Sequence, residues 1–147
     1  MGDVFLVKKI LIASDHAGFE LKKYLIEALK KYNLEIEDLG CDSAKNSVDY
    51  PDFAEKLCQK ISENNFGILI CGSGTGVTMC ANRHKHVRAA LCYNKNITQL
   101  SRSHNNANVI CLGARFTKKK LALSLCKTFL TKKFDGNRHT NRIKKFS

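Results

Sequence analysis

The hexapeptide from Cys71 to Gly76, C-G-S-G-T-G, combines a reactive thiol with three alternate glycines. Glycines let backbone N–H groups approach an anion closely, and a helix that starts after them adds the positive end of its dipole. The segment is not a dinucleotide-binding G-x-G-x-x-G, since Val77 occupies the last position, and it lacks the Gly-Lys-Ser/Thr of a Walker loop. An ordinary tight turn needs fewer glycines, so we interpret the segment as an oxyanion or phosphate cradle.

Cys71 lies at the mouth of this loop, where a helix N-terminus and nearby cations would favour the thiolate, the reactive form. We interpret the other cysteines as structural, because most of them fall in apolar stretches where a free thiol behaves as a small hydrophobe. No C-x-x-C pair occurs, which excludes zinc-ribbon and thioredoxin-like sites, and seven scattered cysteines favour a reducing compartment. The structural cysteines are Cys41, Cys58, Cys80, Cys92, Cys111 and Cys126.

Two further polar clusters contain residues that carry out proton transfer or bind ligands in other proteins. Asp15 and His16 follow an apolar run, where they are equally compatible with site residues and with a helix cap followed by an exposed neighbour. His104, Asn105 and Asn106 form the second cluster, for which the alternative is a polar helix terminus. The sequence alone leaves both alternatives open.

Two pairs of basic residues are also candidates. Arg138 and Arg142 are one helical turn apart, a spacing at which two guanidiniums can bind one phosphate. The alternative, a solvated basic tail, fits the lysines at 144–145. His84 and His86 have no carboxylate nearby in the sequence, so we expect a solvated corner there and no metal site.

Short apolar runs alternate with amphipathic segments along the chain. Residues 9–14 form an apolar run that ends at a polar corner, whereas leucines in the next segment recur at helical spacing with lysines on the other face. This alternation predicts an α/β protein with a five-stranded parallel sheet covered on both faces, a three-layer αβα, Rossmann-like architecture. Strands are expected near 9–14, 34–39, 66–71, 87–92 and 108–112, and helices near 21–32, 51–61, 77–82, 97–104 and 117–132.

The candidate residues lie close to the ends of these predicted strands. In an open parallel sheet, ligands bind beyond the carboxyl ends of the strands. Asp15 follows the first strand, residues 71–76 follow the third, and residues 103–105 precede the fifth, so we expect the three groups at one edge. Residues 1–147 are expected to form one domain, with a polar C-terminal arm from about residue 134 that packs across the surface or a partner.

The net charge of +12 is distributed unevenly. Residues 1–63 hold nine Lys/Arg and twelve Asp/Glu, residues 64–134 hold twelve Lys/Arg and no carboxylate, and residues 135–147 hold four Lys/Arg and one Asp. High positive charge by itself suggests nucleic acid or an anionic membrane as partner. An acid-free stretch of 71 residues indicates, more specifically, that this half of the chain binds an anion.

The sequence shows no membrane or targeting segment. No apolar run is long enough to span a bilayer, the N-terminal apolar stretch is too short for a signal peptide, and Leu6 breaks the myristoylation pattern. We therefore expect a soluble, cytoplasmic protein without a membrane partner.

Six segments that run in order through the chain resemble the type B ribose-5-phosphate isomerases, a family shared with the galactose-6-phosphate and allose-6-phosphate isomerases. The resemblance covers almost the whole chain, and the combination of segments is highly specific. The segments are I-A-S-D-H-A-G-F-E-L-K (12–22), V-D-Y-P-D-F-A (48–54), I-L-I-C-G-S-G-T-G (68–76), Q-L-S-R-S-H-N-N-A-N-V (99–109), L-G-A-R (112–115) and R-H-T-N-R (138–142).

The resemblance implies an aldose–ketose isomerase of the pentose phosphate pathway that interconverts D-ribose 5-phosphate and D-ribulose 5-phosphate through an enediolate, with no cofactor and no metal. The cysteine that matches Cys71 is the proton-shuttling base in part of the family, while other members use a glutamate in the loop. Val77 stands at that glutamate's place, and no carboxylate occurs between Glu63 and Asp135, so the chain resembles the cysteine branch.

The resemblance also implies a role for each matching residue. His104 would assist ring opening, Asp15 would orient the sugar hydroxyls, and Ser73 with the loop amides would stabilise the enediolate oxygen. Family members are dimers or tetramers whose site is shared between subunits, so a homodimer or a dimer of dimers is expected. The substrate-binding set is Asp15, His16, Tyr50, Gly72, Ser73, Gly74, Thr75, Gly76, Asn105, Arg115, Arg138 and Arg142.

Two rival functions remain at this point. A relative that acts on six-carbon sugar phosphates, such as allose or galactose 6-phosphate, would carry the same motifs. A basic nucleic-acid-binding protein would need exposed aromatic residues interleaved with its cations, but the basic half has few aromatics and most lie within predicted elements. We therefore expect a sugar phosphate as ligand and no nucleic acid as partner.

Overall fold

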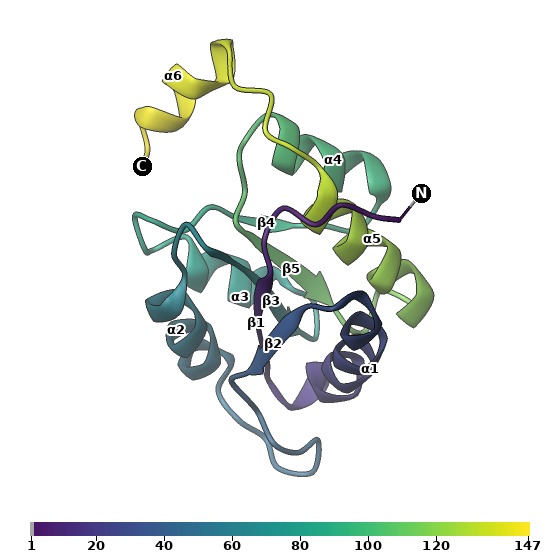
Figure 1. Ribbon diagram of the computed structural model, residues 1–147. Helices are drawn as coiled ribbons and strands as arrows, with labels where there is room; N and C mark the ends of the chain where they lie inside the picture. The colour runs from purple at the N-terminus through teal and green to yellow at the C-terminus, as the bar shows by residue number, and fades with distance from the viewer. Residues whose placement is uncertain (1) are drawn as a thin grey trace.

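The protein is described here from a computed structural model, which covers residues 2–147. Five parallel strands form one sheet in the order β2-β1-β3-β5-β4 (Figure 1). The strands are β1 (Lys9–Ser14), β2 (Glu35–Asp38), β3 (Asn65–Cys71), β4 (Ala89–Leu91) and β5 (Val109–Gly113). The helices are α1 (Phe19–Leu29), α2 (Tyr50–Lys60), α3 (Thr75–Ala81), α4 (Lys95–Ser103), α5 (Lys119–Thr131) and α6 (Arg138–Lys144), with short 3₁₀ turns η1 (His16–Gly18) and η2 (Lys30–Tyr32).

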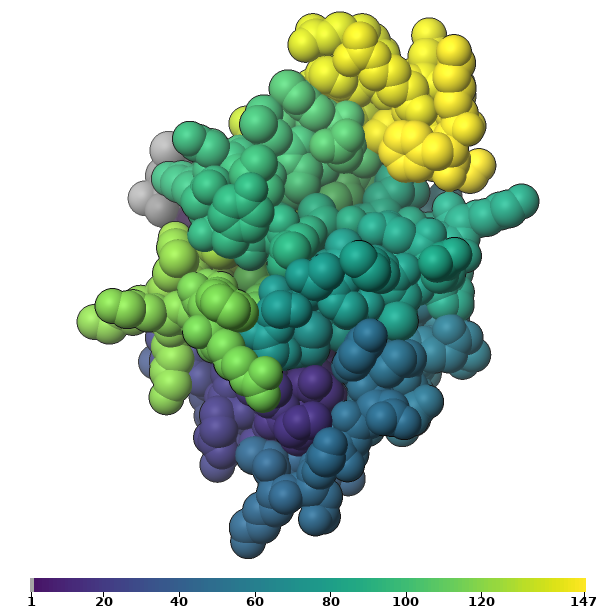
Figure 2. All heavy atoms as spheres, turned by 180° about the vertical axis from the view of Figure 1, so that it is seen from behind, coloured from purple at the N-terminus to yellow at the C-terminus, as the bar shows by residue number. Residues whose placement is uncertain are grey.

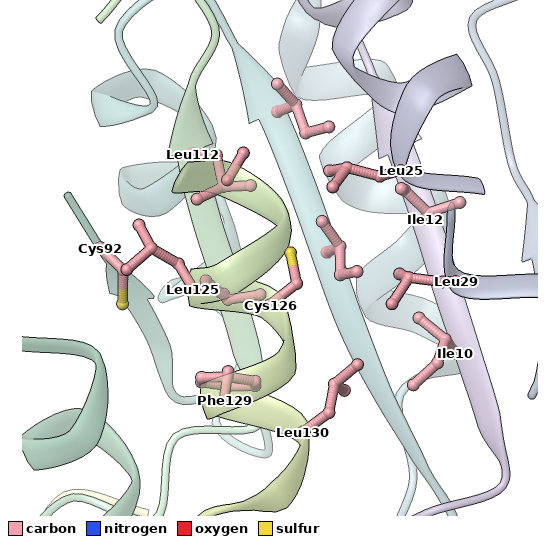
Figure 3. Packing of buried hydrophobic residues seen from close by; sticks show 14 of the residues in the cluster. Ile10, Ile12, Leu25, Leu29, Cys92, Leu112, Leu125, Cys126, Phe129 and Leu130 are labelled. Atoms are coloured by element: carbon pink, nitrogen blue, oxygen red, sulfur yellow. The ribbon is translucent and has the colours of Figure 1, made fainter. Parts of the chain in front are cut away.

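Helices cover both faces of the sheet, because alternate residues of each strand point to opposite sides. On one face, Ile10 and Ile12 of β1 pack with apolar residues of α1 and α5, such as Leu25 and Phe129 (Figure 3). On the other face, Leu11 and its neighbours pack against α2 and α3. Strands buried on both faces explain the nearly continuous apolar runs of β1 and β3, and the predicted three-layer αβα architecture is confirmed.

The predicted elements are confirmed in order, with differences at their ends. The edge strands β2 and β4 are shorter than the segments 34–39 and 87–92, because an edge strand pairs on one side only. The polar arm after residue 134 contains α6, which Figure 1 shows reaching away from the sheet beside α4. Within the described residues, no helix is long and apolar enough to cross a membrane.

The expectation that all polar clusters share one edge is wrong. Asp15 and Cys71 lie at the carboxyl edge, where β1 and β3 end side by side. His104 and Asn105 lie before β5, and the residue that precedes a parallel strand belongs to the opposite, amino edge. The four residue steps from Val109 to Gly113 alone separate the two edges by about 13 Å at the usual rise of a strand.

A buried lysine ties α1 to the end of β2. Lys22 is 1% exposed, and its ammonium donates to Asp38 Oδ1 at 2.6 Å and to the carbonyl of Cys41 at 2.7 Å. The backbone of the same corner is bonded to Ser14, with Ser14 N to Gly40 O at 2.7 Å and Cys41 N to Ser14 O at 2.9 Å. The ammonium therefore stabilises the corner that borders Asp15.

Replacing this lysine should destabilise the fold. In Lys22→Met the apolar stem remains, but the Asp38 carboxylate and the Cys41 carbonyl lose the ammonium donor, and Asp38 keeps only the N–H of Gly40. We therefore expect the free energy of unfolding to fall by about 3 kcal/mol. Urea denaturation followed by circular dichroism measures this change. Lys23→Met, at the exposed next position of α1, is the control and should stay within about 0.5 kcal/mol of the wild type. Equal stability of the two variants would contradict the prediction.

Candidate active site

The glycine loop turns β3 into α3 around the thiol of Cys71. Cys71 is the last residue of β3 and 4% exposed, and the backbone N–H of Gly74 donates to its Sγ at 3.1 Å. Gly74 has φ +79°, and a Cβ at this position would lie 2.8 Å from the backbone of Leu112. A side chain is therefore excluded at Gly74, and the turn brings a backbone donor to the sulfur, where it stabilises negative charge.

Arg115 and Tyr50 flank the loop on its two sides. A Cβ on Gly72 would lie 2.9 Å from Nη1 of Arg115, and a Cβ on Gly76 would lie 2.5 Å from the ring of Tyr50. The backbone of Arg115 also donates to Gly72 O at 3.0 Å, which ties the β5–α5 turn to the loop. These two glycines allow the guanidinium and the phenol to contact the cradle directly.

Asp15 and His16 sit beside the loop at the end of β1. Asp15 N donates to Ile70 O at 3.2 Å, and its Oδ1 accepts from Gly18 N at 3.1 Å, so this carboxylate does cap a 3₁₀ turn. The cap uses one carboxylate oxygen and leaves Oδ2 for a ligand. His16 Nδ1 accepts from Val48 N at 3.1 Å, which assigns the proton of the neutral ring to Nε2.

A second cluster surrounds His104 at the amino edge. The ring of His104 stacks on that of His139, with centroids 4.2 Å apart and 17° between the planes. Asp135 N donates to Ser103 O at 2.9 Å, which holds the arm against the end of α4. Arg138 and Arg142 are exposed on α6. Asn105 lines a cavity of about 470 Å³ together with residues 82–85 and 87–90, Ala107 and Phe146.

The predicted site residues thus fall into two groups within one chain. Those at the carboxyl edge form the Cys71 cluster, and those at the amino edge form the His104 cluster. The Cys71 cluster comprises Asp15, His16, Tyr50, Cys71, Gly72, Ser73, Gly74, Thr75, Gly76 and Arg115, and the His104 cluster comprises His104, Asn105, Arg138 and Arg142. His139, which sequence reasoning missed, joins the second group, and its place in R-H-T-N-R was the available signal.

The other thiols differ from Cys71 in their surroundings. Burial raises the pKa of Cys58 to about 12 and also raises the pKa values of Cys111 and Cys126, so these thiols stay protonated near neutral pH. In the part of the chain that the structure describes, Cys71 is the cysteine whose sulfur accepts a backbone N–H. This contact sets Cys71 apart as the candidate base.

The histidines near residue 85 lie on a partly exposed corner, as expected, and each also has a hydrogen-bond partner that the sequence did not indicate. His84 Nε2 lies 2.7 Å from Glu55 Oε2, and His86 Nε2 lies 2.8 Å from Cys58 O. The fold brings Glu55 of α2 to His84, although the two are distant in the sequence. Among residues 2–147, no group of three His, Cys, Asp or Glu side chains is arranged to hold a metal ion.

Acid should loosen the docking of the arm. Burial of His139 lowers its pKa below the usual range; His104, Arg138 and Arg142 act in the same direction, and Asp135 opposes them. Below the ordinary histidine pKa of about 6.5, the free arm therefore binds more protons than the docked arm, and docking weakens as the pH falls. Above that pH both forms of His139 are neutral, and docking does not depend on its titration. Limited proteolysis should cleave the arm several-fold faster at pH 5 than at pH 7.5.

The matched control for this pH effect is His139→Gln, which keeps a planar polar side chain but does not titrate. Its cleavage rate should change much less between the two pH values than that of the wild type. Cleavage of the wild-type arm that is equally fast at both pH values would contradict the prediction.

Comparison with known proteins shows the family of the chain. The family model for Ribose/Galactose Isomerase matches residues 10–146. The chain belongs to this family. It is therefore a sugar phosphate isomerase, an intramolecular oxidoreductase, with the type B ribose-5-phosphate isomerases among its homologues.

Individual relatives align with the isomerase over nearly its full length. The structure of ribose 5-phosphate isomerase B from Anaplasma phagocytophilum superposes with a TM-score of 0.96 at 44% identity, covering 98% of this chain and 99% of that one. The Mycoplasma genitalium ribose-5-phosphate isomerase B with bound ribulose-5-phosphate gives 0.90 at 44% identity, covering 93% and 92%. A relative from Rickettsia bellii is 43% identical, and the alignment covers 92% of this chain and 95% of that protein. Its name, sugar phosphate isomerase, specifies no particular sugar.

Proposed function

We propose that the isomerase interconverts D-ribose 5-phosphate and D-ribulose 5-phosphate. The observation that carries this proposal is the cradle at the carboxyl edge, where the Gly74 N–H donates to the Cys71 sulfur. The loop belongs to a stretch of the sequence, residues 64–134, that holds no carboxylate of its own. The Mycoplasma genitalium relative, which holds ribulose-5-phosphate, supports a five-carbon substrate.

In the proposed mechanism, the Cys71 thiolate removes the proton from C2 of the open-chain aldose. The electron pair of the broken C–H bond forms the C1–C2 double bond of an enediolate, and the charge moves to oxygen. Ser73 and the loop N–H groups stabilise this oxygen. The thiol returns the proton to C1, while a hydroxyl proton moves between O2 and O1, which completes the ketose without net oxidation.

The other residues prepare the substrate for this transfer. His104 gives a proton to the ring oxygen while the anomeric hydroxyl loses one, which opens the ring. Asp15 orients sugar hydroxyls through the oxygen that its cap leaves free. His16, Arg138 and Arg142 bind the phosphate, and Tyr50, Asn105 and Arg115 complete the pocket.

A single chain does not bring these groups together, because the Cys71 and His104 clusters occupy opposite edges. We therefore propose a homodimer, or a dimer of dimers, in which the Cys71 cluster of one protomer faces the His104 cluster of its partner. Residues 1–147 act as one isomerase domain whose arm, from about residue 134, reaches the partner's cradle. All seven cysteines are free thiols, which supports a cytoplasmic location.

A coupled assay on ribose 5-phosphate, with and without a chelator, tests the reaction and the absence of a metal requirement together. We expect turnover that the chelator does not change. Allose 6-phosphate and galactose 6-phosphate are assayed in parallel, because the matching family model includes galactose isomerases. A kcat/KM that is higher on either six-carbon substrate than on ribose 5-phosphate would replace the proposed substrate.

A further inference from the structure

Five exposed cations lie at the carboxyl edge, on the side of the cradle where β5 and β4 end. They stand where α4 and α5 begin and on the turn before α5, all within the acid-free half of the chain. We call them the basic rim: Lys95, Arg115, Lys118, Lys119 and Lys120.

The basic rim is joined to the cradle through the backbone. Ala114 N donates to Cys71 O at 2.9 Å and Arg115 N to Gly72 O at 3.0 Å, so the turn that carries the rim is bonded to the glycine loop itself. Three residues further along, Lys118 starts the run of lysines. Figure 2 shows the lime-green chain around residue 120 projecting from the surface beside the purple N-terminal part. The rim is thus rigidly attached at its base and solvated at its tips.

No carboxylate neutralises the rim within the described residues. The ion pairs of residues 2–147 involve carboxylates of residues 3–63, and none of them includes a rim cation. Lys119 Nζ instead lies 5.8 Å from the ring of Tyr24. Unpaired cations over an acid-free segment produce a positive potential that extends about one Debye length, roughly 10 Å at 0.1 M salt, into the solvent.

The position of these lysines opposes the usual preference of a helix. The positive dipole end of a helix N-terminus favours Asp or Glu in the first turn. On the acidic half of the molecule α1 and α2 follow this rule with Glu20 and Asp52. The first turns of α4 and α5 hold no acid and carry lysines instead. Lysines in first turns where acids are preferred, beside a candidate site, indicate that these positive charges have a function.

We propose that the basic rim is an electrostatic funnel, which attracts the doubly negative sugar phosphate toward the cradle and favours it over uncharged sugars. The rim lysines stay solvated in this role and do not hold the bound phosphate. This inference rests on the proposed isomerase function, because it assigns the anion as the substrate of that same site. Steering of this kind raises association rates and weakens as salt screens the field.

The test compares two triple variants that remove the same charge. Lys118→Gln/Lys119→Gln/Lys120→Gln reduces the rim, and Lys8→Gln/Lys30→Gln/Lys31→Gln removes three exposed lysines where β1 and β2 begin, at the other edge of the acidic half. At an ionic strength of about 20 mM, we expect kcat/KM of the rim variant to fall about five-fold with kcat unchanged. The inhibition constant of inorganic phosphate should rise by a similar factor. The control variant should stay within about two-fold of the wild type.

Salt supplies the second arm of the test. At about 0.5 M salt the Debye length is a few ångströms, so the rim variant and the wild type should become equal. A loss that persists at high salt, a loss in kcat, or an equal loss in the control variant would overturn the inference while leaving the isomerase function intact. Failure of the wild type to isomerise any sugar phosphate would instead count against the proposed function.

Discussion

The Cys71→Ala variant should retain its fold and lose isomerisation, with kcat on ribose 5-phosphate reduced by at least about 10³-fold. General acid–base catalysis contributes roughly 10²–10⁴-fold, and residues 64–134 contain no carboxylate that could replace the thiol. Proton transfer is measured directly in deuterated water, where the wild type exchanges the substrate C2 proton and the variant should not. Circular dichroism and thermal unfolding establish that the variant is folded.

The control for this substitution is Cys80→Ala on α3, which removes a thiol of the same size close behind the cradle. Burial raises the pKa of Cys80, so this thiol stays protonated, and its variant should keep activity within about two-fold. Near-normal turnover by Cys71→Ala would refute the cysteine mechanism. If both variants lose activity while Cys80→Ala stays well folded, activity depends on how the thiols pack, and the loss in Cys71→Ala is not evidence for a catalytic base.

Two inactive variants should restore activity to each other when their chains are mixed. The Cys71→Ala chain carries an intact His104 cluster, and the His104→Asn chain, expected to lose about 10²-fold in kcat, carries an intact Cys71 cluster. In a shared site each mixed pair contains one site built entirely from unchanged residues. Equal amounts, unfolded together and refolded, should therefore recover about a quarter of the wild-type activity.

The control is a mixture of Cys71→Ala with the double variant Cys71→Ala/His104→Asn, in which no combination of chains forms an intact site. It should stay inactive under the same refolding conditions. Mass spectrometry of the intact assemblies establishes that mixed species are present. Mixed species without recovered activity would show that each chain holds a complete site, and the proposed assembly would be wrong.

The sequence predicted the sheet well, because burial on both faces leaves a local signature. β1 and β3 appear as short apolar runs, and the glycine loop after β3 could be assigned to a strand-to-helix turn from its composition alone. The ends of β2 and β4 were less accurate, since an edge strand is partly exposed and its pattern merges with the adjoining loops.

The placement of the site residues depended on tertiary contacts that the sequence does not display. The pattern around His104 gives a helix terminus, but whether that terminus lies near Cys71 depends on strand direction, which puts it at the other edge. The stacking of His139 on His104 and the pairing of Lys22 with Asp38 join residues far apart in the chain. Nothing in the local composition indicates either contact.

In the proposed assembly, the separation of the two clusters makes catalysis depend on protein concentration. A dissociated protomer would keep the proposed base at one edge and the proposed ring-opening histidine at the other, so we expect dilution below the dissociation constant of the assembly to remove activity without unfolding any chain. Each protomer must also preserve two faces for sites that it completes only with its neighbour. In a pair of chains, a defect in one face of one protomer therefore inactivates one of the two shared sites and leaves the other intact.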